Sequence, residues 1–284
     1  MAFHNKWRLL DTNYQSPFLN MALEEALLKT CESDNFVPTI RFWVNRSAVV
    51  IGRFQDVSIE VDTKLCQREK VSIVRRFTGG GTVYHDEGNL NFTILSEKHD
   101  LGLEAVQLRN ISVVREALAR LGVESTISPP NSLMVSGKKI SGSASAVIHG
   151  FILWHASLLI STNLEKLQLV LRPGKNITHT IHVRSRYQPT TSLQYLLGKV
   201  IQATEVKHHL LESVNDVLRV KTRRGSVSTH EKMTAQWLHD HKYSTDLWNY
   251  DGQEIHNILM DSHDYCRVSS FNTLDRLNLA DHEL

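Results

Sequence analysis

RRFTGGGTVYHD (residues 75–86) joins a predicted strand, VSIVR (71–75), to a second one, TVYHD (82–86). The backbone N–H groups of three successive glycines can converge on phosphate or carboxylate oxygens, because no side chains keep a ligand away. Arg75 and Arg76 add fixed positive charge and planar donors. The stretch therefore predicts an anion-binding loop between two strands, and the alternative is a flexible hairpin with two solvated arginines. It is not a P-loop, because no GK[ST] follows the glycines.

The segments around this loop predict an α/β fold with a mixed β-sheet flanked by helices. Ser16 and Pro17 are typical of a helix start, and apolar residues follow them at helical spacing. Runs of β-branched and aromatic residues predict strands in the first half of the chain. The predicted strands are 39–44, 47–52, 71–75, 82–86, 89–95 and 151–160, and further helices are predicted around 111–121, 164–171, 203–219 and 229–241.

A second informative segment is SLMVSGKKISGSAS (132–145), which predicts a hairpin that turns at Ser136-Gly137. Small residues along its second strand leave space beside the strand. A lysine at the start of that strand could reach into this space and neutralise a phosphate or a developing charge. The alternative is a basic turn with two surface lysines.

Bulk properties narrow the classes of function. The chain has 284 residues and a formal net charge of +2, so neither a nucleic-acid partner nor a membrane partner is expected. Three cysteines without a CxxC pair disfavour a zinc site and favour a reducing, cytoplasmic location. The start, MAFHNKW, lacks the apolar stretch of a secretory signal, so no leader sequence is expected. The pattern predicts one domain over 1–252, a polar loop over 173–189 and a short tail over 253–284, which is too short to fold alone.

The two motifs together resemble the signatures of lipoate–protein ligases and lipoyltransferases. RRFTGGGTVYHDEGNLNF (75–92) is similar to the glycine-rich signature of the family, and KKISGSA (138–144) to its lysine motif. Weaker similarities follow in the expected order at 49–55, 154–162, 183–193 and 248–252. The resemblance covers roughly residues 7–252 and implies a catalytic domain of the biotin/lipoate protein ligase type.

The resemblance implies roles for individual residues. Lys139 would be the catalytic lysine that touches both the carboxylate and the phosphate. Arg75 would face the phosphate and acyl region of an acyl-adenylate. His155 would line the acyl tunnel, or else be a core histidine satisfied by a backbone carbonyl. The ATP or adenylate site would comprise Arg75, Gly79, Gly80, Gly81, Thr82, Val83, Tyr84, Asn89 and Lys139, and the lipoyl site Arg75, Lys139, Gly142 and His155.

The implied reaction uses ATP, Mg²⁺ and lipoate. Lipoate would be activated to lipoyl-AMP and passed to a lysine of an acceptor lipoyl domain, of the 2-oxoacid dehydrogenase E2 or glycine cleavage H protein type. The chain departs from the family at Asn131-Ser132, where an Asn-Asp pair is common, so the metal ligands stay unknown. The 253–284 tail is too short for the accessory domain of many members, which a separate subunit would then supply.

Three alternatives stay open. The chain could transfer an acyl group from lipoyl-AMP or from an octanoyl carrier, although no cysteine lies near either motif to form a thioester. It could instead be a non-catalytic protein that binds lipoyl domains. A biotin ligase is disfavoured, because the GRGR-type loop is absent.

Overall fold

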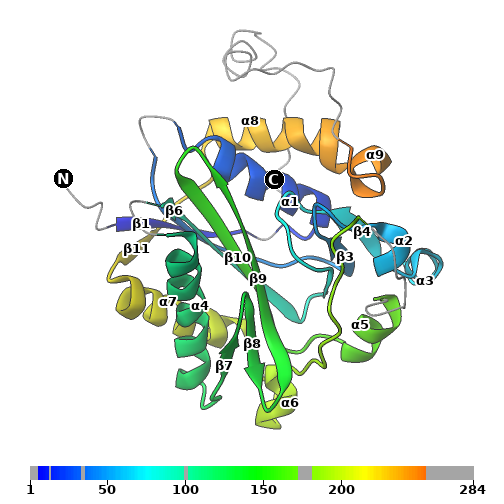
Figure 1. Ribbon diagram of the computed structural model, residues 1–284. Coiled ribbons are helices and arrows are strands. Elements are labelled where there is room, and N and C mark those ends of the chain that lie inside the picture. The colour runs from blue at the N-terminus through cyan, green and yellow to red at the C-terminus, as the bar shows by residue number, and fades with distance from the viewer. Residues whose placement is uncertain (1–5, 13, 33–35, 99–101, 172–180, 254–284) are drawn as a thin grey trace.

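Two β-sheets of unequal size form the centre of the structure, a computed structural model that describes residues 6–12, 14–32, 36–98, 102–171 and 181–253 (Figure 1). In this part of the chain the larger sheet has the strand order β11-β1-β2-β6-β10-β9-β8-β7, and the smaller has β4-β3-β5. In the larger sheet β1 runs parallel to β2 and β11, whereas the other pairs are antiparallel, so the predicted mixed sheet is confirmed. The strands are β1 (Lys6–Asp11), β2 (Thr39–Trp43), β3 (Ala48–Ile51), β4 (Ser72–Arg75), β5 (Val83–His85), β6 (Asn89–Glu97), β7 (Thr126–Ser128), β8 (Ser132–Val135), β9 (Lys138–Ile148), β10 (Phe151–Leu159) and β11 (Lys221–Arg224).

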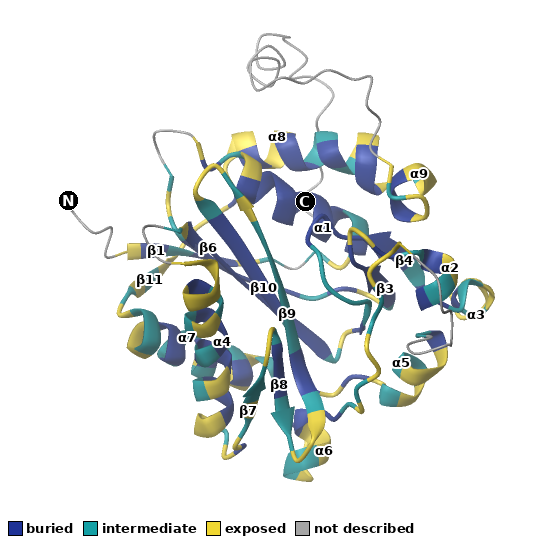
Figure 2. Ribbon diagram, viewed as in Figure 1, coloured by how far each residue is buried: buried dark blue, intermediate teal, exposed yellow. Residues whose placement is uncertain are grey.

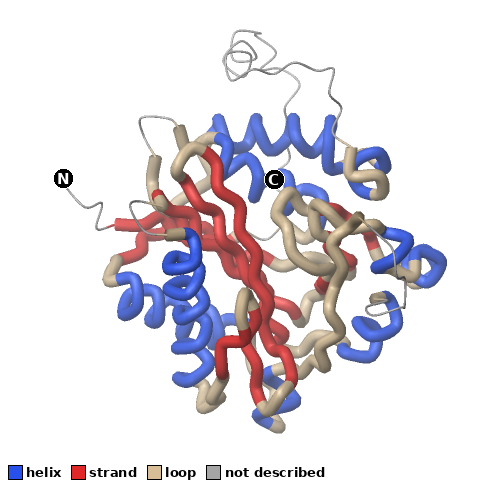
Figure 3. Tube along the Cα trace, in the orientation of Figure 1, coloured by secondary structure: helices blue, strands red, loops and turns tan. Residues whose placement is uncertain are grey.

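Helices cover both faces of the larger sheet (Figures 1 and 3). Helices α4 and α7 pack against each other on one face, and α1 and α8, together with the smaller sheet, lie on the other. Figure 2 shows that strands β6 and β10, between these layers, are buried along most of their length. The helices are α1 (Pro17–Lys29), α2 (Val57–Glu60), α3 (Thr63–Arg68), α4 (Leu103–Arg120), α5 (Leu164–Val170), α6 (Leu193–Leu197), α7 (Ala203–Leu218), α8 (Thr229–Leu238) and α9 (Asp246–Asn249). None of the helices described is long and apolar enough to span a bilayer.

Alternation along β2 explains why the larger sheet supports two different layers. Ile40 and Phe42 belong to the hydrophobic cluster under α4 and α7, whereas Trp43 belongs to the cluster under α1 and α8. Successive side chains of a strand point to opposite faces, so a fully buried strand supplies both clusters. Arg41 lies on the α1 side, where its charge needs a buried partner.

Most predicted elements are confirmed. The hairpin turns at Ser136-Gly137, and Ser16 caps α1 by accepting a hydrogen bond from the Leu19 N–H. The predicted helix over 229–241 instead ends as an α-helix at Leu238 and continues as a π-helix, His239–Tyr243. There the carboxylate of Glu25 accepts hydrogen bonds from Lys242 and Tyr243.

Several elements were not predicted: β1, β7, β11, α2, α6 and α9. Of the polar loop predicted over 173–189, residues 181–189 are irregular and hydrogen-bonded to the body of the protein, and residues 172–180 lie outside the described part. All but the first residue of the 253–284 tail also lies outside it, so the predicted domain boundary stays a prediction.

Candidate active site

Two cavities open between the larger and the smaller sheet. The first has a volume of about 490 Å³ and the second about 370 Å³, within the range of small-molecule sites. They share Thr82, Val83, Lys139 and Gly142 among their lining residues, so they meet where the glycine-rich loop approaches strand β9. A ligand with two dissimilar halves could therefore occupy both cavities at once.

Arg76 holds the glycine-rich loop in shape. Its guanidinium donates hydrogen bonds to the carbonyl oxygens of Gly79 and Gly81, at 2.6 and 2.7 Å, and to that of Val50 at 3.0 Å. Gly80 has a φ of +88°, which a residue with a Cβ rarely adopts. Burial lowers the pKa of Arg76 to about 10, so the group stays charged at neutral pH. The loop thus presents backbone and a fixed cation to the first cavity.

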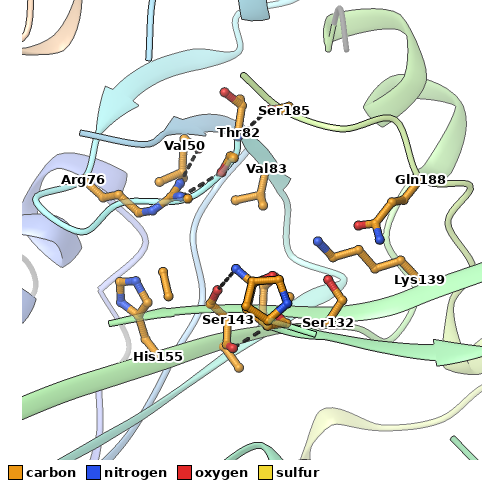
Figure 4. A pocket seen from close by; sticks show the side chains of 18 of the residues that line it. Val50, Arg76, Thr82, Val83, Ser132, Lys139, Ser143, His155, Ser185 and Gln188 are labelled. Atoms are coloured by element: carbon orange, nitrogen blue, oxygen red, sulfur yellow. Dashed lines mark hydrogen bonds between the residues drawn. The ribbon is translucent and has the colours of Figure 1, made fainter. Parts of the chain in front are cut away.

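Lys139 enters the same cavity from the opposite side (Figure 4). Its backbone is fixed on both sides, because its N–H donates to the Pro189 carbonyl at 2.7 Å and its carbonyl accepts from the Thr191 N–H at 3.0 Å. Burial, together with the charge of Arg76, lowers the pKa of Lys139 to about 8. Lys138 points the other way, is exposed, and has its Nζ 5.5 Å from the centre of the Tyr195 ring. Alternation along the strand thus selects one lysine for the cavity.

The irregular segment 181–190 lies over the glycine-rich loop. The hydroxyl of Ser185 accepts hydrogen bonds from the Thr82 N–H at 2.9 Å and from the Gln55 side chain at 3.0 Å. The Ser185 N–H donates to Oε1 of Glu60 at 3.1 Å. A backbone donor of the loop is therefore occupied by a side chain of this segment.

A buried network of charged and polar side chains lies next to the first cavity. Oε1 of Glu24 accepts a hydrogen bond from Arg41 at 2.7 Å, and its Oε2 lies 3.1 Å from Nδ1 of His155. Burial alone would raise the pKa of Glu24, but the hydrogen bond from His155 and the charge of Arg41 outweigh it, so that pKa lies below its usual value. His155 lines the first cavity, and its Nε2 lies 3.0 Å from the Thr78 hydroxyl. Its partners are therefore side chains, and the alternative of a backbone carbonyl was wrong.

Arg75, expected to face the phosphate and acyl groups, lines neither cavity. Its guanidinium donates to the carbonyl oxygens of Gln55 at 2.7 Å, Trp248 at 2.9 Å and Tyr250 at 2.9 Å. The physical reason for this placement is the direction of side chains on β4, which turns Arg75 toward the α9 segment. Its neighbour Arg76 lines the first cavity instead.

The other predicted residues divide into two groups. Gly80, Gly81, Thr82, Val83, Lys139, Gly142 and His155 line the first cavity, and Tyr84 lines the second. Gly79 and Asn89 line neither, although the Gly79 carbonyl is held by Arg76, and Asn89 donates to the side chain of Asn91 at 3.1 Å. Four further residues line the cavities but were not predicted from the sequence: His85, Asn91, Glu60 and Ser185. Asn91 lies two residues after Asn89 on the same strand, so alternation could have identified it.

The donors for a metal ion are few. Among the residues that the structure describes, no group of three His, Cys, Asp or Glu side chains could hold an ion. Ser132 replaces the acid expected before the lysine and lines the first cavity. In the second cavity one carboxylate oxygen, Oε2 of Glu60, is buried and has no hydrogen-bond partner among the described residues. Mg²⁺ is commonly held by one or two carboxylates plus substrate phosphates, a mode that fits this sparse set.

Comparisons with known proteins agree with this geometry. The profile of the lipoyl protein ligase A/B catalytic domain matches residues 16–215. The chain is 28% identical over 242 residues to lipoate-protein ligase A subunit 1 of Thermoplasma acidophilum, covering 81% of this chain and 91% of that protein. It is 29% identical over 272 residues to octanoyltransferase LipM of Anoxybacillus flavithermus, covering 86% of this chain and 98% of that protein.

Solved structures give the same picture. The chain superimposes with a TM-score of 0.79 and 28% identity on a bipartite lipoate protein ligase studied with its E2 lipoyl domain from T. acidophilum, covering 90% of this chain and all of that one. A structure of a ligase from the same organism with bound lipoic acid gives a TM-score of 0.77 at 27% identity. The match covers 87% of this chain and 99% of that one. A lipoate-protein ligase A bound with ATP gives a TM-score of 0.75 at 28% identity. The match covers 87% of this chain and all of that one.

Proposed function

This chain belongs to the family of lipoyl protein ligase A/B catalytic domains, and from that premise we propose that it transfers a lipoyl group from lipoyl-AMP to a lysine of an acceptor lipoyl domain. The observation that carries the proposal is the meeting of the two cavities at Lys139. A lipoyl chain in the first cavity and the adenosine in the second would place the mixed anhydride beside the lysine amine. The resemblance found in the sequence motifs is confirmed by the family match.

Catalysis by these residues is positioning and electrostatic stabilisation. The lipoate carboxylate attacks the α-phosphorus of ATP, and pyrophosphate leaves. The acceptor lysine, in its neutral form, then attacks the acyl carbonyl, AMP leaves, and the amide nitrogen loses a proton. Arg76 and Lys139 reach the first cavity from opposite sides and would stabilise the negative charge of the carboxylate and the phosphate in both steps.

The nucleotide half is proposed to lie between the loop and the segment that covers it. Gly80, Gly81 and Thr82 would present backbone donors, with Val83 and Tyr84 beside the base. Mg²⁺ would be held chiefly by the phosphates of ATP, with Glu60 as the available carboxylate. It would neutralise the leaving pyrophosphate.

A second polypeptide is proposed to assist the first step. One relative is named subunit 1 of a lipoate-protein ligase, and one matched structure is described as bipartite, each covered over at least 91% of its length. The acceptor would be a lipoyl domain of the E2 type, as in the same study, or of the H protein type.

An acyltransferase that uses an octanoyl carrier is the second candidate, because the chain is also similar to octanoyltransferase LipM. A thioester route needs an accessible thiol. Cys31 and Cys66 are buried and line neither cavity, and burial raises the pKa of Cys31 to about 12. Cys266 lies outside the described residues. The two described thiols therefore favour transfer from an adenylate.

The test is a gel-shift assay of an acceptor domain, run once with synthetic lipoyl-AMP and once with lipoate and ATP. We expect modification from lipoyl-AMP, and slow modification from lipoate and ATP until a second protein is added. Equal rates from both would remove the need for a partner. No modification from lipoyl-AMP would overturn the transferase proposal, and modification from an octanoyl carrier alone would favour the second candidate.

A further inference from the structure

Two buried donors without partners line the inner part of the first cavity. His85 is 3% exposed and Asn91 is 1% exposed, and both side chains line the cavity. The Nε2 atom of His85 and the Nδ2 atom of Asn91 have no hydrogen-bond partner among the described residues. Buried polar groups of a folded protein are nearly always paired, so these two atoms point to a ligand acceptor.

Strand register places these donors far from Lys139. Across the sheet, Gly142 of β9 pairs with Ser157 of β10, and Ser157 pairs with Asn91 of β6. Asn91 in turn pairs with Trp43 of β2. Asn91 is two strands away from Gly142, a distance of roughly 10 Å at the usual strand spacing. The ring of His85 lies beyond it, with its centre 6.0 Å from that of Trp43. An acyl chain whose carboxyl end lies at Lys139 would thus end beside His85 and Asn91.

A chain of hydrogen bonds fixes which nitrogen of His85 carries the proton. Arg41 can only donate, and it donates to Oδ1 of Asn20. The amide nitrogen of Asn20 therefore faces acceptors, which are the carbonyl oxygens of Tyr14 and Val44 and, at 2.9 Å, Oδ1 of Asn45. The amide nitrogen of Asn45 in turn donates to Nδ1 of His85, at 3.1 Å.

His85 is therefore the tautomer with hydrogen on Nε2. Asn45 binds the Nδ1 edge of the ring and does not line the cavity. The opposite edge of the ring, with Nε2–H, therefore faces the cavity. Burial, aided by the charge of Arg76, lowers the pKa of His85 to about 3, which keeps the ring neutral.

We infer that the inner end of this cavity selects an acyl chain that ends in a hydrogen-bond acceptor, such as the sulfurs of the lipoyl dithiolane ring, over a chain that ends in a methyl group. The inference rests on the proposed function. A plain alkyl end would bury both donors unpaired, whereas sulfur is a weak, polarisable acceptor. A site built to donate a hydrogen bond rejects analogues that cannot accept one. With an acceptor as weak as sulfur, we expect a lipoyl preference of roughly tenfold, equivalent to about 1.4 kcal/mol.

The test compares kcat/KM for lipoyl-AMP and octanoyl-AMP with one acceptor domain, so that adenylation plays no part. His85→Phe removes the donor and keeps a planar ring, and His85→Gln restores an N–H donor. We expect the lipoyl preference in the wild type, its loss in His85→Phe and its return in His85→Gln. Equal use of both adenylates by the wild type, or an unchanged ratio in His85→Phe, would overturn the selection and leave the transferase proposal intact. If neither adenylate reacts, the transferase proposal itself fails.

A second measurement needs neither variant nor activity. ¹⁵N NMR of the histidine-labelled protein should show a protonated Nε2 and an unprotonated Nδ1 for His85. Addition of lipoate, but not of octanoate, should shift the Nε2 resonance. The opposite tautomer, or equal shifts with both acids, would overturn the inference.

Discussion

Lys139 lies over Gly142, three residues further along its own strand: a Cβ atom at position 142 would meet its Nζ at 2.8 Å and its Cε at 2.7 Å. The lysine therefore occupies the space that the missing side chain leaves. The place of its amine in the cavity depends on this glycine as well as on the hydrogen bonds that fix its backbone.

Gly142→Ala should displace the amine and lower the transfer rate by roughly a hundredfold, the usual effect of an ångström-scale misplacement. Acyl transfer from lipoyl-AMP measures the rate, and the thermal midpoint reports the fold. Val147→Ala, at an exposed position of the same strand, is the matched control and should keep the wild-type rate. A wild-type rate in Gly142→Ala would show that the lysine finds an equivalent position.

Lys139→Ala should lower the rate by about 10²–10³, because it removes one preorganised charged donor. Lys138→Ala is the control, since that side chain is exposed and points away from the cavity. The pair should differ in rate and share a near-native circular dichroism spectrum. If Lys139→Ala retained most of the activity, its amine would have no part in the reaction.

The buried amine of Lys139 should cost stability at neutral pH. Its pKa is lowered to about 8, below the usual value of 10.5, so from about pH 8 to 10.5 the unfolded chain binds more protons than the folded protein. The free energy of unfolding should therefore rise with pH across this window, and the cost is fully present below pH 8. Lys139→Met should be more stable than the wild type at pH 7, by up to about 3 kcal/mol, and this gain should shrink toward pH 10.5. Urea unfolding of both proteins at several pH values measures this gain. A gain that does not change with pH would contradict the lowered pKa of Lys139.

Arg75→Met should lower the free energy of unfolding by about 3–5 kcal/mol, because several buried carbonyl groups would lose their charged donor. Arg46→Met, at an exposed arginine, should change it by less than about 0.5 kcal/mol. Denaturant midpoints provide the comparison. A fully stable Arg75→Met protein that no longer binds nucleotide would restore the phosphate role first expected for this residue.

Ser185→Ala should strengthen binding of the adenylate by a few-fold. The hydroxyl occupies the N–H of Thr82 at 2.9 Å, so a phosphate oxygen has to displace it. One hydrogen bond is worth about 0.5–1.5 kcal/mol net, which sets the size of the effect. Calorimetry with a non-reactive lipoyl-AMP analogue measures the affinity. Weaker binding would instead show that the hydroxyl contacts the ligand itself.

The motifs around the cavity could be predicted from the sequence because each is local. Each can be recognised from a few neighbouring residues: the three glycines, the lysine on a strand of small residues, and the turn at Ser136-Gly137. Two elements missed on one side of the larger sheet are β1 and β11, and β11 is the sequence KTRR, which has three basic residues and no apolar pattern. Its place is set by pairing with β1, some 215 residues earlier in the chain.

The roles of the two arginines could not be separated in this way. Arg75 and Arg76 are adjacent, but Arg75 donates to carbonyl groups of Trp248 and Tyr250, more than 170 positions away, whereas Arg76 donates to carbonyl groups of its own loop. The proton position on His85 is a similar case. It follows from Arg41, Asn20 and Asn45, which lie on other elements and contain no motif of their own.

The long-range ties of Arg75 also set an order of events during synthesis. The glycine-rich loop and strand β9 leave the ribosome well before Trp248 and Tyr250, whose carbonyl groups complete the shell around this guanidinium. A nascent chain that ends between them carries every motif of the pocket but still has an incompletely paired buried cation next to it. The last turn of the described domain therefore supplies the final carbonyl partners of a guanidinium that lies outside both cavities.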